Sequence, residues 1–395
     1  MAIDRAAVLS WYRRNRGRSR ALFDMLPEDV YYQRPIDLRH PVVFYDGHLP
    51  GFSFNTLVKK ALGGPSIDAR LETLFARGID PPSPLRGSGG TSPRVGNGWP
   101  DRDTVRAFVD EADKRVVDAL SKEAAGPEPV FTILEHEAMH QETLLYMWHR
   151  LPFDQKKRPA GYAPVTGGAS PAQAWIEIPG GRATLGVETT AVPFAWDNEM
   201  PSYEVDVPAF EIQKHDVTNA QYLEFVDAGA PAPLFWEKVD GRWYWRGMFE
   251  LIPLPLAWPV YASQAEAVAY ARWRGLRLPT EAEYQRAAID AKPGVCDFSS
   301  WDPEPAGSRP ETRSRYGVED LVGNGWEWTS TPFAPFPGFR PSVSYPEYSA
   351  DFFDGEHFVM KGASPATAKE LIRPSFRNWF RPRYPYVYAT FRCVR

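Results

Sequence analysis

Apolar side chains recur at helical spacing over much of the first 150 residues. The clearest series follows Asp101 and Asp103 and consists of Val105, Phe108, Val109, Ala112, Val116, Val117 and Leu120. Spacings of three and four place side chains on one helix face. We predict helices after the N-cap candidate Asp4, over 54–62, after Asp101 or Asp103, and over about 129–150. Segments 34–52 and 81–100 are predicted loops, and four such helices predict a bundle.

The pattern changes after residues 154–173, where charged residues give way to Gly, Pro, Ala and Ser. Short apolar segments then alternate with turns, as in WIEIPGGRATLG, YEVDVPAFEIQKHDV, RWYWRG, HFVMKGAS and VYATFRCVR. Such segments are typical of strands. Two helices are predicted near 219–226 and 263–273. We therefore expect a two-domain α+β protein, with a helical domain over 1–155 and a loop-rich domain over 172–395.

Composition agrees with a folded protein that is rich in loops. The 395 residues are 43% hydrophobic and 24% charged, which is an ordinary globular balance. Aromatic residues make up 14%, and there are 39 prolines and 30 glycines. This aromatic content argues against disorder, whereas the prolines and glycines argue against an all-helical chain.

Charge and cysteine content narrow the setting of the protein. The net charge is −5. The arginines between 13 and 20 lie between apolar residues at 9, 11 and 12 and at 22 and 23, so we expect a solvated helix face and no nucleic-acid partner. Two cysteines cannot form a disulfide framework, which favours a reducing compartment. We see no signal-peptide core or 18-residue apolar run and therefore expect a cytoplasmic protein without a membrane partner.

Two of the seven histidines, His136 and His140, lie four residues apart in a predicted helix. This spacing places both imidazoles on one face, as in helices that give two ligands to one metal. The segment matches HExxH, and a zincin would use Glu137 as a general base, but no supporting pattern follows. Two ordinary helix histidines are the other alternative. His48 is a candidate third ligand, in a loop where Gly47 and Pro50 would form a tight turn.

The histidine segments also resemble a known family. HLPGFSFNTL and HEAMHQETLLYM are similar to the DinB-type four-helix domain of the ergothioneine-type sulfoxide synthases. The segments RWRGLRLPTEAEYQRAA, GVEDLVGNGWEWTSTPF and ATFRCVR resemble the formylglycine-generating-enzyme fold, which is C-type-lectin-like. The resemblance implies that His48, His136 and His140 bind a mononuclear non-heme Fe(II) and that O2 is a co-substrate. Three protein ligands leave positions open for both substrates.

The same resemblance assigns roles to residues of the second domain. Formylglycine generation is disfavoured because it uses a late cysteine pair, and only Cys393 lies near the end. In SYPEYSADFFDG, Tyr345 corresponds to a catalytic proton donor and Tyr348 to a substrate contact. Asn378 and Trp379 correspond to the pair that holds hercynine, Nα-trimethylhistidine. An aromatic face suits a quaternary ammonium. The alternative is that both tyrosines are ordinary core aromatics.

Departures from the family pattern bear on the second substrate. Enzymes that use γ-glutamylcysteine carry Asp and Arg where this chain has Phe380 and Tyr384, and usually Gln at the position of Met139. Gly-Gly-Ser-Trp is replaced in the segment 361–365. The endings look more like those of selenoneine synthases, which join hercynine to a selenosugar. Aromatic Phe380 and Tyr384 would suit an uncharged donor.

We therefore expect a non-heme iron oxidoreductase that forms a C–Se bond between hercynine and a selenosugar. One alternative is an ergothioneine-type sulfoxide synthase that forms a C–S bond with cysteine or γ-glutamylcysteine. Another is a zinc-dependent DinB-like thiol transferase that needs no O2. A lectin-like binding module without catalysis is a further alternative. We expect small-molecule substrates in each enzymatic case.

Overall fold

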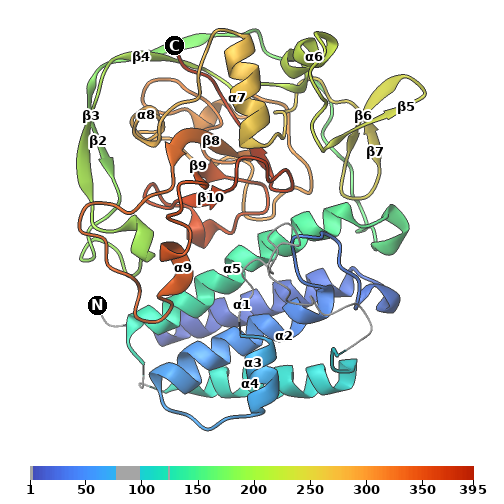
Figure 1. Ribbon diagram of the computed structural model, residues 1–395, viewed down its shortest axis with the longest axis vertical. Coiled ribbons are helices and arrows are strands. Elements are labelled where there is room, and N and C mark those ends of the chain that lie inside the picture. Colours follow the sequence, from blue (N-terminus) through green and yellow to red (C-terminus); the bar gives the residue numbers. More distant parts are fainter. Residues whose placement is uncertain (1–2, 77–97, 123–124) are drawn as a thin grey trace. The chain divides into compact units, whose positions relative to one another are not determined.

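The computed structural model describes residues 3–76, 98–122 and 125–395 (Figure 1). The chain divides into two compact units. The first contains Met1–Ala160 and Val343–Tyr345, and the second contains Gly161–Ser342 and Pro346–Arg395. The change of unit at 160 lies within the predicted linker 154–173. Most of the predicted loop 81–100 lies outside the described residues. The sequence analysis did not predict that Val343–Tyr345 belongs to the first unit.

The first unit is built from helices, several of them long (Figure 1). Asp4 caps the first helix by accepting the Ala7 N–H at 3.1 Å, and Asp101 rather than Asp103 caps the fourth by accepting the Thr104 N–H at 2.8 Å. The α-helices are α1 (Arg5–Asp24), α2 (Val42–Ser53), α3 (Ala69–Leu74), α4 (Arg102–Ser121) and α5 (Pro127–Arg150), with a π-helix at Phe54–Ala61 and short 3-10 turns at Glu28–Val30 and Phe153–Gln155. A helical N-terminal unit was therefore predicted correctly.

The predicted loop over 34–52 is correct only to residue 41, because Val42–Ser53 is the helix α2. Its glycines do not form a turn but allow close packing. A Cβ on Gly47 would lie 2.5 Å from the Phe75 ring, and a Cβ on Gly51 would lie 3.3 Å from the Phe108 ring. Almost every residue of α2 is buried, so the helix shows no polar face. Pro50 is tolerated inside it, although a proline removes one helical hydrogen-bond donor.

The second unit combines short strands with three longer helices and many loops (Figure 1). Its helices are α6 (Asn219–Asp227), α7 (Gln264–Trp273), α8 (Glu281–Ala287) and α9 (Glu347–Ala350), with 3-10 turns at Asp197–Glu199, Pro310–Thr312 and Lys369–Leu371. Its strands are β1 (Trp175–Ile178), β2 (Gly181–Leu185), β3 (Tyr203–Val207), β4 (Phe210–Gln213), β5 (Trp236–Val239), β6 (Arg242–Arg246), β7 (Leu251–Pro253), β8 (Gly325–Pro332), β9 (Phe358–Ala363), β10 (Asn378–Phe380) and β11 (Ala389–Thr390). The α+β class is thus confirmed, as are the predicted helices α6 and α7.

The largest sheet of the second unit has the strand order β10-β9-β8-β11. Strands β8 and β9 are antiparallel, β9 and β10 are antiparallel, and β11 runs parallel to β8. Smaller sheets pair β1 with β4, β2 with β3, and β5, β6 and β7 in that order. A hydrophobic core joins β1–β4, α8 and the final residues, including Ile178, Phe210, Tyr284 and Val394.

Strand β8 and helix α8 are among the elements of the second unit that the sequence analysis did not predict. Strand β8 is a central strand whose first five residues are all buried, so it lacks the alternation by which half-buried strands are recognised. Helix α8 is only seven residues long, and its signal lies in its cap. Thr280 and Glu283 form a reciprocal capping box there.

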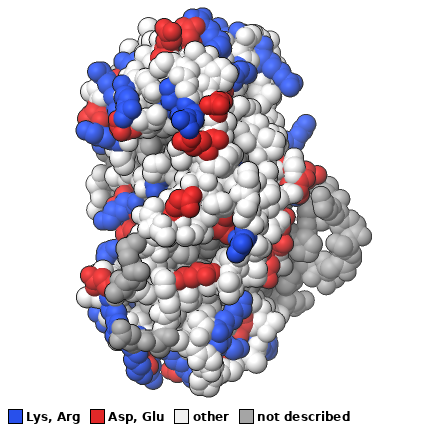
Figure 2. Space-filling model, turned by 90° about the vertical axis from the view of Figure 1, so that its left-hand side faces the viewer, with Lys and Arg blue, Asp and Glu red and all other residues white. Residues whose placement is uncertain are grey.

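Surface charge is mixed in sign on the face that Figure 2 displays. Lys and Arg side chains lie close to Asp and Glu side chains on this face. Exposed ion pairs of the second unit include Arg182–Glu204 and Arg315–Asp290. Within the described residues, no helix combines the length and apolar character that a membrane span requires.

The close packing of α2 generates a stability prediction. Replacing Gly47 with Ala places a methyl group against the Phe75 ring, and we expect the free energy of unfolding to fall by about 1–3 kcal/mol. Urea denaturation measures the change. Gly17→Ala is the matched control, because Gly17 lies inside α1 and a Cβ there would meet no atom of the described residues within 4 Å. Its free energy of unfolding should rise by about 0.5–1 kcal/mol. Equal stabilities for Gly47→Ala and Gly17→Ala would contradict this account of α2.

Candidate metal centre and aromatic sites

Three histidines of the first unit come together although they are far apart in the sequence. His48 lies on α2, and His136 and His140 lie one turn apart on α5. One ring nitrogen from each lies within 4.8 Å of the other two, and Nε2 of His48 is 3.3 Å from Nε2 of His140. His48 and His136 are 1% and 3% exposed. This arrangement is compact enough for the three imidazoles to share one metal ion.

The hydrogen bonds and the burial of these rings leave nitrogens available for a metal. Nδ1 of His48 donates to the Phe75 carbonyl oxygen at 2.7 Å, which leaves the lone pair on Nε2. Nδ1 of His136 and Nδ1 of His140 are buried and have no hydrogen-bond partner among the residues that the structure describes. Burial lowers the pKa of His48 to about 4 and lowers the pKa of His136 and of His140 well below the usual value. Neutral imidazole is the form that binds metals.

Aromatic rings surround the histidines. Phe52 stacks on His136 with 3.5 Å between ring centroids and 9° between planes, and Phe44 stacks on His48 at 5.0 Å. The Tyr345 ring lies 5.1 Å from Phe52 and 6.2 Å from His136. The structure thus places Tyr345 beside the histidines, as the proton-donor hypothesis requires.

The Glu137 carboxylate bonds to helix α1 and is not placed as the general base that a zincin would need. Its Oε1 accepts a hydrogen bond from Ser19 at 2.7 Å and one from Arg16 at 3.0 Å, both on α1. Burial raises the pKa of Glu137, and Arg16 opposes that shift. Arg16 also pairs with Asp113 of α4 at 2.8 Å. Glu137 therefore ties α5 to α1, and this geometry argues against the zincin alternative.

Met139 lies on α5 between the two histidine ligand candidates. Met139 follows His136 by three residues, so the two side chains lie on the same side of α5 about one turn apart. Met139 is partly buried. Sequence reasoning missed Phe52, which would have been found if α2 had been recognised as a helix, because Phe52 lies one turn after His48. The hydrogen bond from His48 to the Phe75 carbonyl was also missed, because any residue type can supply a backbone carbonyl.

In the second unit, Tyr348 and Trp379 are brought into contact. Their rings lie 5.2 Å apart and meet edge to face at 78°. Each is braced by another aromatic ring: Tyr348 stacks on Trp196 at 3.9 Å, and Trp379 stacks on Phe333 at 4.2 Å with 5° between planes. Tyr348 is 8% exposed, and Trp379 is partly buried. Two fixed aromatic walls result.

Phe380 and Tyr384 form a separate aromatic pair. Their rings stack at 4.9 Å with 16° between planes, and Tyr386 lies 5.2 Å from Tyr384. Successive residues of a strand point to opposite faces. Phe380 and Asn378 of β10 therefore point away from the face that carries Trp379. The structure does not bring the five predicted substrate residues of this unit into one group.

Buried charges hold the segment that leads into β10. Arg377 forms two hydrogen bonds with Glu281, and Arg373 pairs with Glu199. Burial would raise the pKa of Glu199, but Arg373 holds it below its usual value. Lys361 of β9 donates to the carbonyl oxygens of Pro374 and Phe376 at 2.8 and 2.7 Å. These contacts fix the backbone immediately before Asn378.

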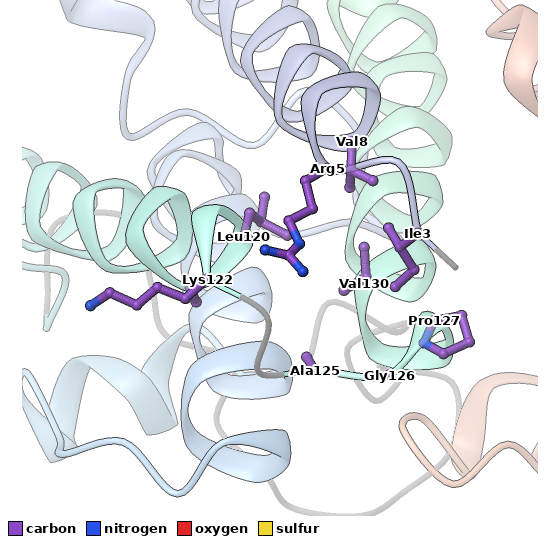
Figure 3. Close-up of a pocket in the computed structure, with 10 residues that line it drawn as sticks. Ile3, Arg5, Val8, Leu120, Lys122, Ala125, Gly126, Pro127 and Val130 are labelled. Atoms are coloured by element: carbon purple, nitrogen blue, oxygen red, sulfur yellow. The ribbon is translucent and has the colours of Figure 1, made fainter. Parts of the chain in front are cut away.

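A cavity of about 230 Å³ lies elsewhere in the first unit, between the start of α1, the end of α4 and the start of α5. Figure 3 shows the Arg5 side chain among the apolar side chains of Ile3, Val8, Leu120 and Val130. The histidines and Tyr345 are not among its lining residues. It is therefore distinct from the candidate metal centre.

The chain matches one family model and is similar in sequence to several named proteins. The family model of the sulfatase-modifying factor enzyme 1-like domain matches residues 163–295 and 293–395. Hercynine oxygenase of Mycolicibacterium smegmatis is 36% identical over 298 residues, covering 63% of this chain and 67% of that protein. Hercynine oxygenase of Mycolicibacterium thermoresistibile is 35% identical over 332 residues, covering 73% and 74%. Ergothioneine biosynthesis protein 1 of Schizosaccharomyces pombe is 30% identical over 422 residues, covering 94% of this chain and 54% of that protein.

The buried amine of Lys361 predicts a pH dependence of stability. Burial lowers the pKa of Lys361 to about 8 from 10.5, so the unfolded chain binds the proton more tightly. Its contribution to the free energy of unfolding should therefore rise between pH 8 and pH 10.5, by up to about 3 kcal/mol. Chemical denaturation of the wild type and of Lys361→Met at several pH values isolates this effect. A pH-independent difference between the two proteins would contradict it.

We predict that the histidine cluster binds a metal ion and that removing one histidine weakens the binding. His136→Ala should lower the affinity for Fe(II) by at least tenfold to a hundredfold, because two imidazoles remain. Anaerobic equilibrium titration with Fe(II) measures this. His215→Gln is the control, since His215 contacts Glu319 in the second unit. If both variants bind Fe(II) like the wild type, the cluster is not the metal site.

Proposed function

The chain belongs to the family of sulfatase-modifying factor enzyme 1-like proteins and, within it, to the ergothioneine synthase group of oxidoreductases, and on this premise we propose that it joins a chalcogen atom to the imidazole C2 of hercynine with O2 as the oxidant. The observation that carries the proposal is the buried cluster of His48, His136 and His140 with Tyr345 beside it. We further propose that the helical unit is of the DinB type.

The histidine cluster would hold Fe(II). Three neutral nitrogen donors suit iron and leave open positions for substrates. Bound iron would supply the means to activate O2 for oxidation. With a thiol donor the reaction balances as follows: the imidazole C2–H and the S–H are lost, a C–S bond forms, and the sulfur takes up one oxygen atom. The second oxygen atom leaves as water, so O2 accepts four electrons.

Tyr345 would act as the proton donor in this reaction. Its ring lies 6.2 Å from that of His136, and Phe52 contacts both rings, so the phenol is held near the cluster in an aromatic setting. A phenol that is positioned by packing can deliver a proton without solvent rearrangement. Met139, on the same helix face as His136, would contact a substrate.

Tyr348 and Trp379 would bind the trimethylammonium group of hercynine. A quaternary ammonium has no N–H to donate, and contact with an aromatic face contributes about 0.5–2 kcal/mol. The rings meet at 78°, and each is fixed by a stacked neighbour, so two walls are already in place before binding. Asn378 would act on the same substrate indirectly, because its Oδ1 accepts the Trp379 N–H at 2.9 Å and holds the backbone of the residue that carries the ring.

The donor is proposed to be a thiol such as cysteine or γ-glutamylcysteine, in keeping with the hercynine oxygenases that this chain resembles. A selenosugar is the second candidate, with a C–Se bond as the product. The observation in its favour is the stacked pair of Phe380 and Tyr384, an uncharged surface that matches a neutral donor. Flat aromatic rings bind sugar faces through apolar contact.

Turnover with defined donors tests the proposal. The purified chain, loaded with Fe(II), is incubated with hercynine and with cysteine, γ-glutamylcysteine or 1-seleno-glucose, singly and in competition. Mass spectrometry identifies the products, with and without O2. We expect a hercynine adduct that forms only when O2 is present, with one donor preferred by at least tenfold.

Each outcome has a clear meaning. Equal product without O2 would exclude the oxidative reaction. Activity with Zn(II) in place of Fe(II) would instead support a thiol transferase. Preference for the seleno-sugar would establish the second candidate, and preference for either thiol would exclude it as the principal donor.

A further inference from the structure

We propose that Glu128 is a positioning residue for Tyr345. The Ser344 N–H donates to Oε1 of Glu128 at 2.9 Å. Ser344 belongs to the short segment Val343–Tyr345, which packs with the first unit, whereas the chain on either side belongs to the second unit. The bond therefore holds the residue next to Tyr345. The inference rests on the proposed function in one respect, the role of Tyr345 as proton donor.

The burial of the segment shows why a polar anchor is needed. Val343 is 87% exposed, and Pro346 and Glu347 are also exposed, so they add little apolar contact. Tyr345 is only partly buried, against the bundle core. Packing positions a side chain more closely when a hydrogen bond nearby adds a restraint. The hydrogen bond to Ser344 supplies that restraint one residue away.

Helix α5 carries both the anchor and the histidines. Glu128 lies in its first turn, and His136 follows eight residues later, about 12 Å along the helix axis. One rigid element thus sets the distance between the backbone of Ser344 and the histidine cluster. A carboxylate at a helix N-terminus is stabilised by the helix dipole, and a charged acceptor makes a stronger hydrogen bond than a neutral one.

The bond can be removed from either side. Glu128→Ala removes the acceptor, Glu128→Gln keeps an oxygen acceptor without the charge, and Ser344→Pro removes the donor without changing α5. Tyr345→Phe is the reference variant, because it removes the proton itself. Asp118→Ala is the matched control, since Asp118 is an exposed carboxylate of α4 that pairs with Lys122.

The first measurement needs neither iron nor substrate. Hydrogen–deuterium exchange read by mass spectrometry reports the amides of residues 342–345. We expect exchange to accelerate by about tenfold in Glu128→Ala, the loss of one hydrogen bond. In Ser344→Pro, which has no amide at 344, the same acceleration is expected at the amides of 342, 343 and 345. Exchange should remain near the wild-type rate in Glu128→Gln and Asp118→Ala. Unchanged exchange in Glu128→Ala would overturn the anchor.

The second measurement asks whether the anchor acts through Tyr345. In the Fe(II)-loaded enzyme, Glu128→Ala should lower kcat by about tenfold and retain Fe(II) affinity. The solvent deuterium isotope effect and the ratio of coupled product to oxidised donor should shift in the direction seen for Tyr345→Phe. Glu128→Gln should restore most of the rate. A double variant with Tyr345→Phe should lose no more than Tyr345→Phe alone.

Additive losses in the double variant, or a changed ratio in Tyr345→Phe without one in Glu128→Ala, would overturn the positioning role. If Glu128→Ala does not fold, Ser344→Pro decides the question by the same readouts. Wild-type protein that converts no hercynine with any donor would contradict the proposed function. The exchange comparison would still decide whether Glu128 holds the segment.

Discussion

The approach of His48 Nε2 to within 3.3 Å of His140 Nε2 requires that α2 be held close to its neighbours. Gly47 and Gly51 permit that closeness, because any side chain there would meet Phe75 or Phe108. Phe75 in turn accepts the hydrogen bond that orients His48. The same close packing excludes water and keeps the imidazoles neutral. The packing of α2 and the orientation and protonation state of His48 thus follow from its contacts with Phe75 and Phe108.

Different faces of helix α5 make different contacts. His136 and His140 face α2, whereas Glu137, which is about 100° further around the helix, bonds to Arg16 and Ser19 of α1. The buried pair of Glu137 and Arg16 is costly to break, since removing one partner leaves an unpaired charge. The ion pair therefore fixes the rotation of α5 about its axis. The HExxH spacing has a structural explanation that needs no catalytic glutamate.

Local signals in the sequence predicted the cap at Asp4, a cap at Asp101 or Asp103, the helices α6 and α7, and the proximity of His136 to His140. They did not predict α2, because glycine and proline are read as turn residues when their tertiary neighbours are unknown. Strand β8 was missed because burial on both faces removes alternation. The placing of Tyr345 beside His136 depended on family resemblance, since the two are distant in sequence and no periodicity relates them. Glu128 was missed because it acts on a backbone N–H.

The alternation of β10 limits how the aromatic residues can share substrates. Trp379 packs on Phe333 with its plane fixed, while Phe380 points to the other face and stacks on Tyr384. A trimethylammonium group that contacts Trp379 and Tyr348 cannot also lie against Phe380, because the strand backbone stands between them. Under the proposed function, substitutions at Phe380 or Tyr384 should alter the choice of donor with little effect on the binding of hercynine. Substitutions at Trp379 or Tyr348 should instead weaken the binding of hercynine with little effect on the choice of donor. The binding of the two substrates can then be altered separately.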